Sequence, residues 1–177
     1  AVATVRFDER GPEHLARQPF AQVPFLDDGA IRIFESGAGL LHLAEKSDVL
    51  MPRDAQGKAD TQQWVIAALN SIEMVTVPWW FISLSKPPEN PLKGWMTQRF
   101  ERLEAVLEAR DWLAAGRFTA ADLLMADVLR VPGDLGELEK FPALKAYVAR
   151  ITARAAFRKA RRDQIAFFEA ADAGRSV

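Results

Sequence analysis

The chain has 177 residues, of which 49% are hydrophobic, enough for a packed core and too many for a disordered chain. Its 23 basic and 24 acidic residues give a net charge of −1, so the total charge provides no attraction for nucleic acid or an anionic membrane. Cysteine is absent, which excludes disulfides, thiolate zinc sites and a cysteine nucleophile within these residues. Because there are also only two histidines, we expect no metal site. From the near-neutral total charge we expect no nucleic-acid partner.

Neither a membrane span nor an export signal is expected. The strongest apolar run, residues 75–84, contains Pro78 and is far shorter than the roughly 20 residues that a bilayer requires. The first residues lack the basic and apolar regions of a signal peptide. We therefore expect a cytoplasmic protein without a membrane partner.

The beginning of the chain reads as short strands. Alternating apolar and polar residues predict a strand over residues 2–7, and one helical turn is expected at residues 13–17. Two further strands, over residues 23–26 and 30–34, flank Asp27-Asp28-Gly29. This turn sequence predicts a hairpin, because an Asp-Gly pair tolerates the positive φ that hairpin turns need.

After Ser36 the apolar residues recur at helical spacing. Pro52, Gly57 and several charged residues then predict a linker. Further helices are expected over residues 59–84 with a bend at Pro78, over 92–115, over 119–130, and once or twice within 142–168. The order predicts an α+β domain over residues 1–46, a linker over 47–58 and an all-α helical-bundle domain over 59–177.

Two short motifs carry candidate chemistry. Gln22-Val23-Pro24 opens a strand with a proline, which favours a cis bond and leaves backbone groups free for an extended peptide; equally, Pro24 could end a loop. Glu35-Ser36 lies where a strand passes into a helix. There Ser36 suits a helix cap, and the helix N-terminus suits a carboxylate or phosphate. Taken singly, each motif is explained by local structure.

Taken together, the motifs resemble a known family. Residues 19–29, 33–38 and 43–46 closely resemble the amino-terminal domain of cytosolic glutathione transferases. Residues 116–123, 141–144 and 147–157 resemble the carboxy-terminal helices of the same family, in the right order. The resemblance implies a thioredoxin-like amino-terminal domain, incomplete in this chain, followed by the all-α domain.

The resemblance also implies a function. Members of this family conjugate the glutathione thiolate to electrophilic small molecules in detoxification, so glutathione is expected as substrate and an electrophile as second partner. A homodimer is expected, with the helices after Ser36 and Ala59 at the contact. Two other functions stay open: a binding or scaffold protein without catalysis, and a glutathione-dependent isomerase, dehalogenase or reductase of the same fold.

The family's glutathione contacts match particular positions here. The backbone of Val23, before the cis proline Pro24, would pair with the cysteinyl part, while Glu35 and Ser36 would hold the γ-glutamyl end. In this family Ala21 is commonly Gly. The matched binding residues are Gln22, Val23, Pro24, Glu35 and Ser36, with Arg17 or Gln18 as candidates for the glycyl carboxylate.

Two roles lie outside this binding set. Thr119 and Asp122 match the family's helix-start signature, and we expect them to cap that helix without a catalytic role. The family's catalytic residue, a Tyr, Ser or Cys, lies at the end of the first strand or the start of the first helix. In this chain that position is expected upstream of Ala1.

Overall fold

The computed structural model describes residues 2, 5–6 and 9–173. By its internal contacts the chain divides into two compact units, residues 1–40 with 153–177, and residues 41–152, which are taken separately below. Of the strand predicted over residues 2–7, residues 2, 5 and 6 lie outside regular structure, and the other positions lie outside the described residues. The domain boundary predicted at residues 47–58 stays a prediction.

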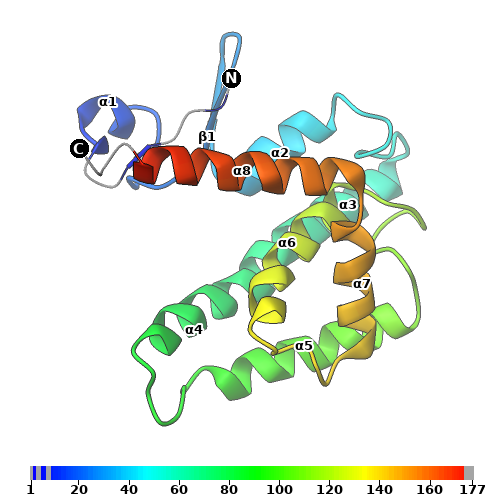
Figure 1. The fold of residues 1–177 in the computed structure, drawn as a ribbon. Coiled ribbons are helices and arrows are strands. Elements are labelled where there is room, and N and C mark those ends of the chain that lie inside the picture. The colour runs from blue at the N-terminus through cyan, green and yellow to red at the C-terminus, as the bar shows by residue number, and fades with distance from the viewer. Residues whose placement is uncertain (1, 3–4, 7–8, 174–177) are drawn as a thin grey trace. The chain divides into compact units, whose positions relative to one another are not determined.

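The first unit contains a β-hairpin (Figure 1). Strand β1 (Phe25–Asp28) pairs antiparallel with β2 (Ile31–Phe34), and Phe25 lies opposite Phe34. The two-residue turn begins at Gly29, whose φ of +66° is the left-handed conformation that glycine adopts without steric cost. The predicted hairpin is therefore confirmed, although β1 begins at Phe25 rather than Val23.

Three helices complete this unit or begin in it. The short α1 (Pro12–Leu15) precedes the hairpin, and α2 (Ser36–Ala44) follows it and runs into the second unit. The last helix, α8 (Ala155–Ala173), has no buried residue.

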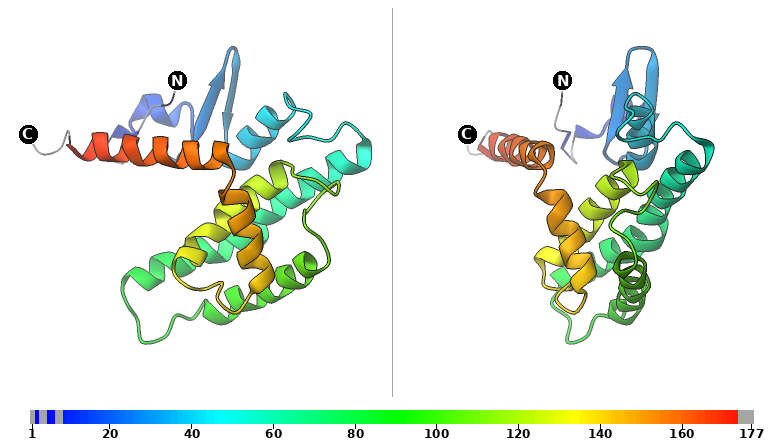
Figure 2. Two further views of the ribbon diagram at one scale, coloured as in Figure 1. Left: turned by 45° about the vertical axis from the view of Figure 1, so that its right-hand side comes forward. Right: turned by 90° about the vertical axis from the view of Figure 1, so that its right-hand side faces the viewer.

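A continuous helical stretch of 30 residues dominates the second unit (Figures 1 and 2). It consists of α3 (Ala55–Ala67), a π-helical segment η2 (Ala68–Glu73) and α4 (Met74–Leu84). It begins four residues before the predicted start, because Asp54 caps it by accepting a hydrogen bond from the Gly57 N–H at 2.7 Å. The helix continues through Pro78.

This helix is long and apolar enough to cross a bilayer, with a mean hydropathy of 1.5, contrary to the expectation from residues 75–84. Length and composition alone do not make a membrane span, because core helices of water-soluble proteins meet the same criterion. In this unit the stretch packs against two neighbouring helices, α5 (Lys93–Glu108) and α6 (Ala120–Asp134).

The helix predicted over residues 92–115 ends early, at Glu108. The backbone N–H of Leu113 donates to Asp122 Oδ1 at 2.9 Å, and Ala115 and Gly116 have φ values of +53° and +60°, which no α-helix accommodates. The single or double helix expected near the end is two helices, α7 (Pro142–Thr152) and α8.

The core of the second unit lies where α6 and α7 pack against each other and against their neighbours α3 and α5. Phe100 and Phe141 meet edge to face there, with ring centroids 5.7 Å apart. The fully buried side chains of this core include Val65, Met96, Phe100, Met125, Leu129, Leu144 and Ile151. The α+β fold class, a hairpin unit followed by a helical bundle, is confirmed.

Asp122 is a buried polar centre in this core. Its Oδ2 accepts hydrogen bonds from the Thr119 N–H at 2.9 Å and the Thr119 hydroxyl at 3.1 Å, while Oδ1 also accepts the Tyr147 hydroxyl at 3.0 Å. Burial raises the pKa of the Asp122 carboxyl, an effect that these hydrogen bonds and that of Leu113 only partly offset. Burial and the neighbouring Asp122 raise the pKa of Tyr147 well above its ordinary value.

The raised pKa of Asp122 predicts a pH-dependent stability. The unfolded carboxyl ionises near pH 4, whereas the folded one holds its proton to higher pH. Over this window the folded state binds more protons, so the free energy of unfolding contributed by Asp122 falls as pH rises, by at most about 1.4 kcal/mol per pH unit.

Chemical denaturation of wild type and Asp122→Asn between pH 4 and 8 tests this. The stability advantage of wild type over the variant should shrink as pH rises through the window and then level off. Leu129→Ala, a buried change without a titrating group, should show a constant offset. An advantage that grows with pH would contradict the assignment.

Candidate functional site

The hairpin register brings the two sequence motifs to the same end of the sheet. Phe25 and Phe34 form the last pair, so Pro24 and Glu35 directly flank it, one on each strand. Opposed residues of antiparallel strands have Cα atoms about 4.5–5.5 Å apart. Val23-Pro24 and Glu35-Ser36, separated in sequence by the whole hairpin, therefore form one local surface of the first unit.

Val23 presents its backbone to solvent. Val23 is 53% exposed, and the Val23–Pro24 peptide bond is cis, as the sequence predicted. Within the part of the chain that the structure describes, neither the N–H nor the C=O of Val23 makes a hydrogen bond. A donor and an acceptor on one exposed residue are what an extended peptide needs for antiparallel pairing.

Side chains, two of them buried, fix the loop before Val23 by hydrogen bonds to its backbone. Gln18 is 1% exposed, and its Oε1 accepts hydrogen bonds from the backbone N–H groups of Phe20 and Gln22, at 2.7 and 3.1 Å. His14 is also buried, and its Nε2 donates to the Gln22 carbonyl at 2.8 Å. Arg10 Nη1 donates to the Ala21 carbonyl at 2.6 Å.

The sequence did not predict that these three side chains shape the loop. Gln18, considered as a ligand contact, is buried and serves to shape the loop. His14 and Arg10 act on residues eight and eleven positions away, so local patterns gave no signal for them. The Gln22 side chain stays exposed beside Val23.

Ser36 is the first residue of α2 and does not cap it. Its hydroxyl makes no hydrogen bond to any residue within the described ranges, and the preceding Glu35 has a φ of +70°. The first intrahelical bond runs from the Gly39 N–H to the Glu35 carbonyl at 3.0 Å, so the amides of the first turn stay available. The interpretation of Ser36 as a cap is therefore wrong, and its hydroxyl lies at a helix N-terminus that favours anions.

The guanidinium of Arg17 already interacts with three neighbouring side chains. Its Nη1 lies 3.0 Å from Asp27 Oδ2 and its Nη2 lies 3.3 Å from Glu13 Oε1, and the guanidinium is 5.5 Å from the Phe25 ring centroid. A glycyl carboxylate at this position would share the guanidinium with Asp27. The role of Arg17 stays a prediction.

Among residues 2, 5–6 and 9–173, no group of three or more His, Asp or Glu side chains is placed to hold an ion.

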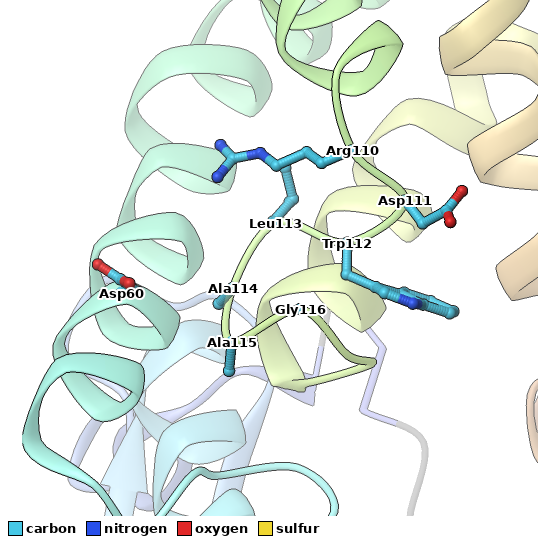
Figure 3. A pocket seen from close by; sticks show the side chains of 8 residues that line it. All are labelled: Asp60, Arg110, Asp111, Trp112, Leu113, Ala114, Ala115 and Gly116. Atoms are coloured by element: carbon cyan, nitrogen blue, oxygen red, sulfur yellow. The ribbon is translucent and has the colours of Figure 1, made fainter.

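The second unit has a polar hollow of about 250 Å³, lined by Asp60 and the loop 110–116 (Figure 3). Arg110 points toward the same space as Asp60, whereas Asp111 and Trp112 point away from it.

Comparison with known proteins decides the family. The model of the glutathione S-transferase N-terminal domain matches residues 2–45, and that of the C-terminal domain matches residues 91–155. The chain belongs to the cytosolic glutathione S-transferase family. The relatives reported below are named glutathione S-transferases, and the fold of this chain is consistent with the family's thioredoxin-like domain followed by an all-α domain.

Individual relatives agree with this assignment. Glutathione S-transferase F11 of Arabidopsis thaliana is 30% identical over 138 residues, 72% of this chain and 64% of the relative, so this chain covers less than two thirds of its length. Probable glutathione S-transferase GSTF2 of Oryza sativa is 28% identical over 167 residues, 86% of this chain and 78% of the relative.

Solved structures share the fold. The glutathione transferase URE2P5 of Phanerochaete chrysosporium superposes with a TM-score of 0.82 at 21% identity, covering 94% of this chain and 82% of its own. Glutathione S-transferase 1-6 of Anopheles dirus superposes with a TM-score of 0.77 at 22% identity, covering 90% and 79%.

The left-handed conformation of Ala21, beside Val23, generates a prediction. Its φ is +53°, where a Cβ is unfavourable, so Ala21→Gly should raise the free energy of unfolding or leave it unchanged, by up to about 1 kcal/mol. Ala38→Gly, inside α2, should lower it by about 1 kcal/mol. Urea unfolding of both variants measures the difference, and equal losses would contradict the strained loop.

Proposed function

We propose that this chain binds glutathione as a substrate at the open end of its hairpin and conjugates the thiolate to electrophilic small molecules, in cytoplasmic detoxification. The observation that carries the proposal is the shared surface of Val23 and Ser36: free backbone groups next to an uncapped helix N-terminus. Family membership makes a transferase the expected class, and the geometry supports the ligand.

Each part of the tripeptide has a complementary group here. The cysteinyl amide would pair with the N–H and C=O of Val23, as in strand addition. The α-carboxylate of the γ-glutamyl residue would accept hydrogen bonds from Ser36 Oγ and the Ser36 N–H at the start of α2. The exposed Glu35 carboxylate would attract the ammonium of the same residue.

A fold neighbour supports the ligand class. Ure2p5 from Phanerochaete chrysosporium, with a TM-score of 0.77 at 22% identity, was cocrystallized with 1-(S-glutathionyl)-2,4-dinitrobenzene. The proposal gives Val23, Glu35 and Ser36 the binding and orientation of glutathione. In the reaction the thiol would first lose its proton to solvent, and the thiolate would then form a bond to an electrophilic carbon. That carbon releases a leaving group with its bonding electrons or, in an addition, the electron pair of a π bond, which then takes up a proton.

The proposed assembly is a homodimer. One face of the long helix carries an exposed apolar stripe whose members are Ile66, Met74, Val77, Phe81 and Leu84, each 42–60% exposed. Four of them lie on α4 at spacings of three or four residues, which puts them on one side of the helix. A contiguous apolar stripe of this kind is typical of a protein contact, and a second copy would cover it.

Removal of the Ser36 hydroxyl tests the glutathione site. Ser36→Ala deletes one charge-assisted hydrogen bond of about 1.5–3 kcal/mol, so glutathione affinity should fall by about ten- to a hundredfold. Thr119→Ala, which removes a group in the core of the second unit, should lower thermal stability and leave affinity unchanged. Calorimetric titration of the full-length protein measures both, and unchanged affinity in Ser36→Ala would contradict the site.

The apolar stripe predicts the assembly state. Phe81→Glu puts a charge at the most exposed position of the apolar stripe and should convert a dimer into a monomer at micromolar concentration. Leu135→Glu, at an apolar position outside the stripe that is 53% exposed against 60% for Phe81, should stay dimeric. Sedimentation velocity distinguishes the two, and a monomeric wild type would contradict the proposed dimer.

A further inference from the structure

The polar hollow of about 250 Å³ in the second unit shares no residue with the proposed glutathione surface (Figure 3). Its lining consists of Asp60 on α3 and residues 110–116 of the loop that joins α5 to α6. The volume equals that of about eight water molecules in the liquid, at roughly 30 Å³ each. The hollow therefore has room for a small organic ligand, of about eight non-hydrogen atoms.

Opposite charges face this hollow without meeting each other. Arg110 and Asp60 point toward the same space (Figure 3). Within the residues that the structure describes, neither side chain forms an ion pair, and Asp60 Oδ1 accepts one hydrogen bond, from Gln56 Nε2 at 2.9 Å. Asp111 points away, and its Oδ1 lies 3.3 Å from Arg150 Nη1. One positive and one negative group thus remain for a ligand.

An aromatic ring orients Arg110. Its guanidinium lies 5.2 Å from the Trp64 ring centroid, a cation–π contact. Trp64 lies one helical turn after Asp60 on α3, so both residues share one face of that helix. Contact with a ring occupies a face of the guanidinium and leaves the N–H groups at its edge for a planar acceptor such as a carboxylate.

The backbone of the loop supplies further donors. Ala115 and Gly116, with φ values of +53° and +60°, are the central residues of a turn that the Arg117 N–H closes by donating to the Ala114 carbonyl at 3.3 Å. Among residues 2, 5–6 and 9–173, no acceptor is present for the N–H groups of Ala114, Ala115 and Gly116. Ala114 is only 3% exposed, and a buried backbone N–H without a partner is rare in proteins. These amides and Arg110 together give the hollow several donors for a carboxylate.

We propose that this hollow binds a small neutral α-amino acid in its zwitterionic form. The carboxylate would accept hydrogen bonds from Arg110 and the loop amides, and the ammonium would meet Asp60. Asp60 would repel a simple anion and Arg110 a simple cation, so the pair selects a ligand that carries both charges. Leu113 and Ala115 also line the hollow and suit a small aliphatic side chain.

The probe for this site is L-valine, which has both charges and about eight non-hydrogen atoms. In a titration of the isotope-labelled full-length protein, the amide signals of Ala114, Ala115 and Gly116 should shift together with one saturable dissociation constant. Isovalerate, which lacks the ammonium, and isobutylamine, which lacks the carboxylate, should each bind about tenfold or more weakly. Shifts confined to Ser36 and Gly37 would put valine on the proposed glutathione surface and overturn the inference.

Two variants separate the two charges. Asp60→Asn should bind valine and isovalerate alike, and Arg110→Met should bind valine and isobutylamine alike. The matched controls, Asp127→Asn and Arg130→Met, each remove one charge from an ion pair on α6 and should keep the wild-type preference for valine. Thermal unfolding checks that each variant is folded, and the comparison of the three compounds on wild type needs no variant. Equal binding of the three compounds to wild type, or a preference for valine that both site variants retain, would overturn the proposal.

Discussion

The register of one short hairpin determines where the candidate site lies. Gly29 begins the turn with a φ of +66°, and this two-residue turn sets Phe25 opposite Phe34. Because side chains alternate with a period of two, a slip of one residue would turn every side chain of a strand to the other face and displace Pro24 from Glu35. The site therefore depends on backbone geometry more than on any reactive side chain.

Hydrogen bonds from buried side chains also hold the loop that leads into the hairpin. The backbone of the loop before Val23 forms hydrogen bonds with the buried side chains of His14 and Gln18. These side chains occupy the Gln22 N–H and C=O, whereas the N–H and C=O of the next residue, Val23, make no hydrogen bond within the described residues. The hydrogen bonds that His14 and Gln18 make to Gln22 therefore leave the adjacent backbone of Val23 available for a ligand.

The sequence predicted the elements whose signals are local. The hairpin turn at Gly29, the helix start at Thr119 and the order of the helices depend on residues close to one another. It failed where a distant group decides the outcome. The loop that follows the end of α5 at Glu108 is fixed by a hydrogen bond between Leu113 and Asp122, nine residues apart. The early start of α3 is an exception, because its cap joins Asp54 to Gly57, only three residues away.

The candidate site shows the same division. Proline and the strand-to-helix junction are visible in the sequence, so Val23, Pro24, Glu35 and Ser36 could be chosen together through the family resemblance. The free hydroxyl of Ser36 could not, because serine at that position is equally typical of a cap.

Amide chemical shifts during a glutathione titration of the isotope-labelled full-length protein test the central claim most directly. The account predicts that the backbone N–H signals of Val23, Ser36 and Gly37 shift together with one saturable dissociation constant, while amides of the second-unit core, such as Leu129, stay in place. Saturable shifts confined to residues outside the hairpin end, or no saturable shift of Val23 and Ser36, would contradict it.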